Sequence, residues 1–410
     1  MGLLLFVCPP SRTTMRGTCS SLLLSSILLP LAVSSLPTHS FGPRANADLP
    51  GTFVEFEELA QCPVLSKRDT PTSAKDVRPD DIRVVMALGD SITAGLLARP
   101  ASSPLFPTNT TFFQTVDVEE YRGISYPMGT DEGAITIPNI LSHFVTDNAT
   151  VQGGAKGHHA PATSALIAQD GLNAAVTTYI VPKLAALGLP GDDDWVYANV
   201  AIGANDICDF CVAPNVSIAG VGTLGSSTAF ANDIRTAVNL LRKHTPKLIV
   251  NIIGILPVSA VYNLTLTNSY CQPAILSDVP HLPLECACAL TPGPIGDVTR
   301  QRMDSTGEAY DNAVLEIVKA WEAEDDDGFG VMWQPGSLID LENYPIEALS
   351  PVDCFHPSEA LHRRVAAGIW NRLTLSLEEK YTKILWDDGP QVRCLEEDDR
   401  FQVNSVSQSS

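Results

Sequence analysis

The stretch Ile82-Arg83-Val84-Val85-Met86-Ala87-Leu88-Gly89-Asp90-Ser91-Ile92 is an apolar run that leads directly into a glycine, an aspartate and a serine. Short runs rich in β-branched residues are typical of buried strands. Because α/β enzymes place their chemistry at the carboxyl edge of a sheet, Ser91 is a candidate nucleophile. A Gly-x-Ser-x-Gly elbow would need glycine where Thr93 stands, so this is not an ordinary α/β-hydrolase elbow. The alternative interpretation of Ser91 is the N-cap of the helix that follows.

Strand patterns alternate with helix patterns through the rest of the chain. Buried strands are predicted at residues 83–88, 196–202, 247–256 and 328–333. Apolar residues recur at helical spacing over residues 230–241, 310–321 and 361–373. This alternation implies right-handed crossovers and a parallel sheet covered on both faces, so we expect a three-layer α/β/α sandwich. Two Pro-, Gly-, Ser- and Thr-rich segments are expected to be loops over its carboxyl edge, at residues 100–139 and 262–298.

Composition limits the classes of protein to which the chain can belong. The chain has 410 residues, 45% of them hydrophobic, and a formal net charge of -21. This length and hydrophobic content suffice for one large domain with insertions. Nucleic-acid binding calls for clustered Lys and Arg, so the acidic balance argues against nucleic acid as a partner. An anionic membrane surface is a poor electrostatic match for the same reason.

The N-terminal region has the order of a secretory signal peptide. Arg12 and Arg16 precede an apolar run at residues 22–33, and small residues follow it. Residues 1–35 are therefore predicted to be a signal peptide, with Met15 as an alternative start. The apolar run is too short to span a membrane comfortably, and no later stretch approaches ~20 apolar residues. We expect a secreted, soluble protein without a stable membrane anchor.

Three regions are expected after the signal peptide. Residues 36–80 are Pro-rich and irregular, and we expect an N-terminal strap that is held in place through Cys62. Residues 81–380 are expected to form the catalytic domain. Residues 381–410 are expected to form an acidic, polar C-terminal tail.

Eight of the ten cysteines lie outside the predicted signal peptide: Cys62, Cys208, Cys211, Cys271, Cys286, Cys288, Cys354 and Cys394. An even set in a secreted chain predicts disulfides, whose pairing the sequence leaves open. The alternative is a metal site that joins Cys208-x-x-Cys211 to Cys286-x-Cys288, although structural zinc sites favour longer gaps and reducing compartments. Four glycosylation sequons also fit a secretory route: Asn109, Asn148, Asn215 and Asn263.

Three later residues are candidates to complete a site around Ser91. A serine hydroxyl needs a base to accept its proton and an acid to orient that base. Asp353 and His356 are three residues apart before a helical pattern, a spacing that lets the carboxylate reach Nδ1 and leaves Nε2 to face a serine. Asn205 follows the predicted strand at residues 196–202, where its amide can donate to an oxyanion. Its alternative interpretation is a turn residue.

The motifs together resemble the SGNH (GDSL) hydrolase superfamily. The matching blocks are Gly89-Asp90-Ser91-Ile92-Thr93-Ala94-Gly95, Gly203-Ala204-Asn205-Asp206 and Asp353-Cys354-Phe355-His356. Within that superfamily the chain is most similar to the phospholipase B-like lipases. The strings that carry this closer resemblance are Glu120-Tyr121-Arg122-Gly123-Ile124-Ser125, Pro138-Asn139-Ile140-Leu141, Asn205-Asp206-Ile207-Cys208-Asp209-Phe210-Cys211 and Asp353-Cys354-Phe355-His356-Pro357-Ser358.

The resemblance implies a fold, a set of roles and no cofactor. The fold would be the SGNH one, with a parallel, flavodoxin-like central sheet. Ser91 would be the nucleophile, His356 the base and Asp353 its orienting acid. The oxyanion hole would comprise the Ser91 amide, Asn205 and Gly129. That family commonly has a Gly-Gly pair where this chain has Gly129-Thr130, so the alternative glycine is Gly123. Neither a metal nor an organic cofactor is implied.

The expected function is a secreted serine esterase that hydrolyses acyl esters of phospholipids or lysophospholipids. The alternative enzyme is a carboxylesterase or carbohydrate acetylesterase, because fold and triad do not choose the leaving group. A secreted binding module is the third interpretation, and an intact set of catalytic residues argues against it. One departure from the family, Leu96-Leu97 after the first block, concerns substrate fit rather than the triad. Acyl-chain preference and oligomeric state are not predicted.

Overall fold

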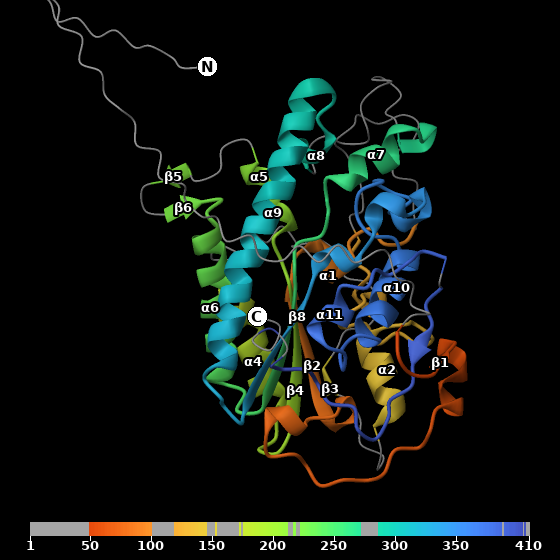
Figure 1. Cartoon of the computed structure of the whole chain (residues 1–410), viewed down its shortest axis with the longest axis vertical. Helices are drawn as coiled ribbons and strands as arrows, with labels where there is room; N and C mark the ends of the chain where they lie inside the picture. The colour runs from red at the N-terminus through yellow and green to blue at the C-terminus, as the bar shows by residue number, and fades with distance from the viewer. Residues whose placement is uncertain are drawn as a thin grey trace, which may run out of the picture. The chain divides into compact units, whose positions relative to one another are not determined.

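A computed structural model describes residues 49–100, 119–145, 152–153, 172–173, 175–211, 216–218, 222–271, 286–387, 389–404 and 406 (Figure 1). The predicted signal peptide and three of the four sequons, at Asn109, Asn148 and Asn215, lie outside these residues. The fourth sequon residue, Asn263, is exposed. Among the described residues, no helix is both long and apolar enough to cross a bilayer.

A five-stranded parallel sheet forms the centre of the molecule. Its strands, in spatial order, are β3 (Gln152–Gly153), β2 (Ile82–Gly89), β4 (Trp195–Ala201), β7 (Leu248–Ile253) and β8 (Phe329–Gln334). Counted along the chain within this sheet, the order is 2-1-3-4-5, which is the flavodoxin-like arrangement. From β2 the chain adds β3 on one side and then β4 on the other, so the order of strand addition reverses between β2 and β4. Ligands are expected at such a point, beyond the carboxyl ends of these two strands.

The strand sequences explain why the sheet is buried on both faces. Every residue of β7 and β8 is buried, as is nearly all of β4. Parallel strands covered on both sides read as continuous apolar runs, and these do. The polar exceptions in these three strands are Asn199, Asn251 and Gln334. The first two pair through an Asn251 Nδ2 to Asn199 Oδ1 hydrogen bond of 3.1 Å. All four predicted strands are present, with bounds shifted by one to three residues.

Helices cover both faces of the sheet (Figure 1). One layer contains α4 (Val181–Leu187), α6 (Ser227–Arg242) and α9 (Gly293–Glu322), and the other contains α2 (Ile137–Phe144) and α10 (Glu359–Trp370). Shorter elements are α1 (Ser91–Ala94), α5 (Ala204–Phe210), α7 (Ala260–Leu266), α8 (Ala287–Leu290), α11 (Leu377–Lys380) and the hairpin of β5 (Val216–Ile218) with β6 (Gly222–Leu224). The three-layer α/β/α sandwich is thus confirmed.

The prediction of irregular loops was wrong for part of residues 262–298. Helices α7 and α8 lie within or overlap this segment, and α9 begins at Gly293 rather than near residue 310. Pro294 stands in the first turn of α9, where its missing N–H costs nothing. At Gly296 a Cβ would lie 1.6 Å from the Thr291 carbonyl oxygen, so glycine is required for close packing. Glycine and proline therefore mark a helix start here rather than a loop.

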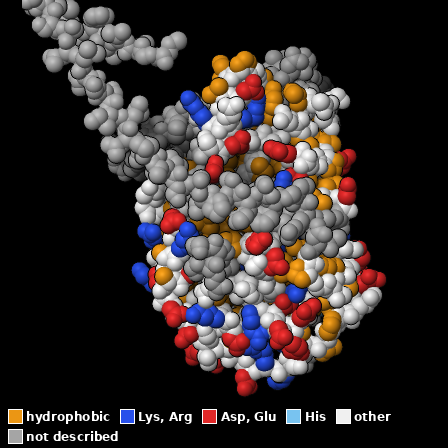
Figure 2. All heavy atoms as spheres, viewed as in Figure 1, with side chains coloured by type: hydrophobic (Ala, Val, Ile, Leu, Met, Phe, Trp, Pro, Cys, Tyr) orange, Lys and Arg blue, Asp and Glu red, His pale blue; other side chains and the backbone are white. Residues whose placement is uncertain are grey.

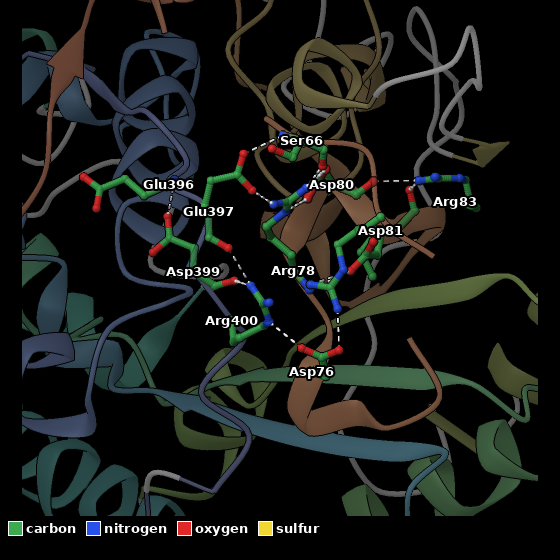
Figure 3. Close-up of polar contacts among 12 residues, drawn as sticks. Ser66, Asp76, Arg78, Asp80, Asp81, Arg83, Glu396, Glu397, Asp399 and Arg400 are labelled. Carbon is green, nitrogen blue, oxygen red and sulfur yellow. Dashed lines mark hydrogen bonds and ion pairs between the residues drawn. The ribbon is translucent and has the colours of Figure 1, made fainter. Parts of the chain in front are cut away.

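The expected strap and the expected tail are joined to each other. Strand β1 (Phe53–Val54) pairs with β9 (Val392–Arg393), and a disulfide links Cys62 to Cys394. Beside them, buried Arg78 forms ion pairs with Asp80 and Glu397 at 2.5 and 2.6 Å (Figure 3). We call this set of contacts the terminal clasp.

The terminal clasp makes the chain's end part of the domain. Leu395, Phe401 and Val403 are buried, so these described residues do not form the polar tail expected from residue 381 onward. Charged side chains of this segment face partners of opposite sign in the strap, as in the Arg400 to Asp76 ion pair of 2.7 Å (Figure 3). Its polarity therefore reflects pairing within the clasp as well as solvent exposure.

The face of the molecule in Figure 2 is mixed in charge. Acidic and basic side chains are interspersed over its lower part, and hydrophobic groups are visible at the upper end, where Figure 1 shows α7, α8 and the first turns of α9. Exposed large hydrophobic residues of these helices include Leu266, Ile295 and Val298.

Candidate active site

The sequence after β2 places Ser91 at the carboxyl edge of the sheet. Asp90 is the N-cap of α1, and its Oδ1 accepts the Ile92 N–H at 3.0 Å. The helix cap is therefore Asp90, which removes the alternative interpretation of Ser91. Gly89 permits the turn, because a Cβ there would lie 2.0 Å from Thr93 Oγ1 and 2.4 Å from the Ala201 carbonyl oxygen. The hydroxyl of Ser91 is thus presented by a tightly packed strand-to-helix turn.

Ser91, His356 and Asp353 form a continuous hydrogen-bonded chain. Ser91 Oγ lies 2.9 Å from His356 Nε2, and His356 Nδ1 lies 2.6 Å from Asp353 Oδ2. The other carboxylate oxygen, Oδ1, accepts the backbone N–H groups of Phe355 at 2.9 Å and His356 at 3.1 Å. Because the carboxylate accepts at Nδ1, that nitrogen carries the proton and Nε2 is left to accept from the serine.

The triad is largely shielded from water. The exposed fractions of Ser91, His356 and Asp353 are 8%, 7% and 2%. Between Asp353 and His356, Cys354 has a positive φ of 55° and forms a disulfide with Cys271. A single tight turn thus carries two of the three residues and is anchored covalently.

Asn205 is brought to the same pocket by β4 and α5. Gly203 caps α5 with a φ of 118°, and a Cβ at this position would lie 2.4 Å from Ile255 Cδ1. Only glycine adopts this backbone freely, so the residue type fits the turn. Asn205 then lies in the first turn of α5 and lines the pocket that also contains Ser91 and His356.

Two disulfides fasten α5 to α8. Cys208 pairs with Cys286, and Cys211 pairs with Cys288. All four cysteines of the alternative metal site are therefore used in disulfides, as the preferred interpretation expected. The element that carries Asn205 is covalently held at two points.

The structure does not bring Gly129 into the pocket. Its backbone N–H donates to the Ser125 carbonyl oxygen at 2.8 Å, so this donor is used within its own loop. The alternative, Gly123, packs against Asp131 and also does not line the pocket. The backbone N–H of Ser91 is better placed, because the first residue of a helix has no intrahelical acceptor. Asn205, which lines the pocket, and the Ser91 amide thus remain the candidate donors.

The pocket beside Ser91 is large and mainly apolar. It lies beyond the carboxyl ends of β2, β4 and β7 and is partly open, with about 1010 Å³ of space between its atoms that includes the solvent at its mouth. Most of its wall comes from the β7–α7 segment, the segment after β8 and helix α10. Apolar lining residues include Ile255, Leu256, Val258, Val261, Leu341, Leu349, Leu361 and Val365. No lysine or arginine is among the described residues that line it.

Two lining residues were missed by the sequence interpretation. Tyr126 follows the quoted string Glu120–Ser125, and His362 lies six residues after His356. His362 is 1% exposed, and the signal that pointed to it was a histidine on the apolar face of a helix, between Leu361 and Val365.

Burial perturbs the ionisable groups near the triad. Burial raises the pKa of Asp90 to about 6, with opposing effects from backbone hydrogen bonds and from the charge of His356. Burial also lowers the pKa of His362 to about 4, because the imidazolium form would lose its hydration; Glu359 opposes this shift and His356 adds to it. At neutral pH, His362 is therefore a neutral imidazole.

Comparison with known proteins agrees with this geometry. The family model described as GDSL-like Lipase/Acylhydrolase matches residues 85–369, which is more than half of the chain. The chain belongs to this family. As a GDSL-like lipase/acylhydrolase it is a carboxylic ester hydrolase, and the expected family and fold class are confirmed.

This GDSL-like lipase/acylhydrolase is similar to three curated mammalian proteins. It is 28% identical over 344 residues to "Phospholipase B1, membrane-associated" of Mus musculus and 29% identical over 346 residues to the protein of that name from Rattus norvegicus. Each alignment covers 80% of the chain and 21% or 22% of the relative. The Homo sapiens protein is 26% identical over 363 residues, covering 83% and 23%. The chain thus spans about a fifth of the length of the curated relatives it matches.

Proposed function

We propose that this protein is a serine esterase that hydrolyses acyl esters of phospholipids or lysophospholipids, of the phospholipase B type. The observation that carries the proposal is the Ser91–His356–Asp353 hydrogen-bonded chain at the wall of a large apolar pocket. Its similarity to proteins named phospholipase B1 supports the choice of substrate.

The proposed mechanism uses only side-chain and backbone groups of the chain. His356 Nε2 takes the proton of Ser91 as Oγ attacks the ester carbonyl carbon. Asn205 and the Ser91 N–H stabilise the resulting oxyanion. Collapse breaks the ester C–O bond, and His356 gives its proton to the departing alcohol oxygen. Water then attacks the acyl-enzyme with His356 as base, which releases the fatty acid and restores Ser91.

The pocket favours a long acyl chain over an acetyl group. Each buried methylene contributes about 0.8 kcal/mol of transfer free energy, so an apolar wall of this extent discriminates between long and short acyl groups. The described lining contains no Lys or Arg that could pair with a phosphate group inside the pocket. This supports a binding mode in which the headgroup stays at the pocket mouth and the acyl chain enters. For these reasons a carbohydrate acetylesterase, the alternative on the same fold, is less well supported.

Secretion is part of the proposal. Four disulfides link the described cysteines, including the pairs Cys62–Cys394 and Cys271–Cys354. Disulfides of this number persist in oxidising compartments and are rare where thiols are kept reduced. An exposed Asn263 in a sequon is compatible with the same route.

The test is lipid product analysis on purified wild-type protein, the Ser91→Ala variant and a Ser305→Ala control at an exposed position of α9. Substrates are palmitoyl lysophosphatidylcholine, dipalmitoyl phosphatidylcholine and an acetylated xylo-oligosaccharide, with released acids measured by mass spectrometry. We expect palmitate from the wild type and Ser305→Ala, and none from Ser91→Ala.

Three outcomes would contradict the proposal. Release of acetate alone would assign the protein to the carbohydrate acetylesterases. Undiminished palmitate release by Ser91→Ala would remove Ser91 as the nucleophile. A wild-type protein that neither hydrolyses these esters nor reacts with a fluorophosphonate serine probe would favour a binding module.

A further inference from the structure

We propose that His362 is a positioning residue that holds the nucleophile's helix and the base's helix in register, through the backbone of Tyr126. The inference rests on the catalytic triad proposed above. It concerns a residue that does not belong to the triad or the oxyanion hole.

The triad is divided between two elements that must stay aligned. Ser91 begins α1, whereas His356 lies in the turn before α10, whose N-cap is Ser358. Their reactive atoms meet across 265 positions of sequence at 2.9 Å. A displacement of α1 relative to α10 would lengthen this hydrogen bond directly, and displacements of about 1 Å at reacting atoms can cost ~10²-fold in rate.

Two successive residues, Ser125 and Tyr126, connect these elements. Ser125 Oγ donates to the Thr93 carbonyl oxygen at 2.5 Å, which fixes the loop to α1. The next backbone N–H, that of Tyr126, donates to His362 Nδ1 at 3.3 Å, which fixes the same loop to α10. Thr93 is two residues from Ser91, and His362 is six residues from His356. The connection therefore joins α1 and α10 at points within six residues of Ser91 and His356.

Packing holds the connection rigid. Ser125, Tyr126 and His362 are 0%, 4% and 1% exposed. The Tyr126 and His362 rings stack with centroids 5.9 Å apart and an interplanar angle of 23°. The Tyr126 hydroxyl also accepts from Asn199 Nδ2 of β4 at 3.3 Å. The loop is thus tied to α1, α10 and the sheet.

The hydrogen bonds of His362 indicate that its role depends on Nδ1 as an acceptor. Because Nδ1 accepts from Tyr126, the proton of the neutral ring is on Nε2, which is buried without a hydrogen-bond partner in the described part of the chain. An unsatisfied buried donor costs about 1–3 kcal/mol, so a phenylalanine would fill this space more cheaply. The acceptor at Nδ1 is the property that phenylalanine lacks.

The test compares His362→Phe, which keeps the ring and loses the acceptor, with His362→Asn, whose Oδ1 can replace Nδ1 as acceptor. His143→Phe, at an exposed histidine of α2, is the matched control. The readouts are kcat and KM on p-nitrophenyl butyrate and the rate of Ser91 labelling by a fluorophosphonate. We expect His362→Phe to lower kcat and the labelling rate by about 10-fold or more with KM within about twofold, because alignment and not binding is lost. His362→Asn is expected to recover most of both rates, and His143→Phe to match the wild type.

Equal losses in His362→Phe and His362→Asn would overturn the inference, because they would show that only ring volume matters. Wild-type rates in His362→Phe would overturn it as well. Should His362→Phe not fold, Ser125→Ala decides, because it removes the other end of the connection, the hydrogen bond to the Thr93 carbonyl oxygen. An unchanged kcat in Ser125→Ala would contradict the bracing role. Failure of the wild type to react with the probe would instead sink the proposed triad, so the two failures are distinguishable.

Discussion

At the scale of the residue, Asn205 is the proposed side-chain donor of the oxyanion hole. It lines the pocket beside Ser91 from the first turn of α5. We expect Asn205→Ala to lower kcat by ~10²-fold or more with little change in KM, because oxyanion donors act in the transition state. Steady-state kinetics on p-nitrophenyl butyrate measure this. The exposed Asn232→Ala of α6 is the control, and an unchanged kcat in Asn205→Ala would exclude the role.

A second prediction at this scale concerns Asp90 and the pH dependence of the free energy of unfolding. Burial raises its pKa to about 6 from the ordinary 3.8, so the folded protein holds this proton more tightly than the unfolded chain does. Stability from this group is therefore fully present below about pH 4 and declines as the pH rises to about 6. Asp90→Asn keeps a capping side chain and removes the titration. Asp311, whose pKa burial raises to about 7, contributes equally to both proteins.

Urea unfolding of wild type and Asp90→Asn across pH 4 to 7 checks this expectation. The difference between the two curves should grow as the pH rises from about 4 to about 6, by at most about 3 kcal/mol for two pKa units. A difference that is independent of pH would show that Asp90 titrates near its ordinary value in the folded protein.

At the scale of the element, α5 depends on its covalent attachment to α8. Seven residues make a helix too short to be stable by itself, so its position must come from tertiary contacts. We expect the Cys208→Ala/Cys286→Ala double variant to lose kcat by about 10-fold while the protein stays folded, because Cys211–Cys288 remains and Asn205 becomes mobile. Kinetics with circular dichroism measure both. A kcat equal to that of the wild type would mean that packing alone positions α5.

The elements that the sequence predicted well are those whose residue types indicate only one kind of secondary structure. The strands β2, β4, β7 and β8 are largely apolar runs, and motif residues follow the first two at the sheet edge. The first half of α9 was missed because Gly293, Pro294 and Gly296 are residue types that also occur in loops. The close approach of Gly296 to the Thr291 carbonyl oxygen, which requires glycine there, is not visible in the sequence. Strand β3, with two residues, is too short for any periodicity.

The sequence predicted the site residues that act through a characteristic side chain. It did not predict those that depend on a backbone N–H or on hydrogen bonds formed only in the folded loop. Ser91, Asp353 and His356 have side chains with few alternatives, and the structure brings them together. Gly129 was chosen by resemblance for its backbone N–H, whose partner, the Ser125 carbonyl, only a folded loop reveals. His362 acts through a tautomer and an accepted backbone hydrogen bond, neither of which leaves a mark in sequence.

At the scale of the whole molecule, the terminal clasp joins parts of the chain that are 332 positions apart. Cross-linking a loop of this length restricts the unfolded chain strongly, and losses of native disulfides typically cost about 2–5 kcal/mol. Around the disulfide, Arg78 is 2% exposed and has carboxylate partners on both sides of the junction. The clasp residues are not among those that line the pocket. Stability and catalysis are thus assigned to different regions of one domain.

This separation predicts that Cys62→Ala/Cys394→Ala lowers the free energy of unfolding by about 2–5 kcal/mol and leaves kcat within about twofold of the wild type. Urea unfolding and kinetics on the same preparations measure the two quantities. The α5 disulfide variant should show the opposite balance, with the larger effect on kcat. A clasp variant that lost kcat as strongly as stability would show that the β1–β9 junction reaches the triad, most directly through Trp370 at the end of α10, whose Nε1 donates to the Arg393 carbonyl oxygen at 2.9 Å.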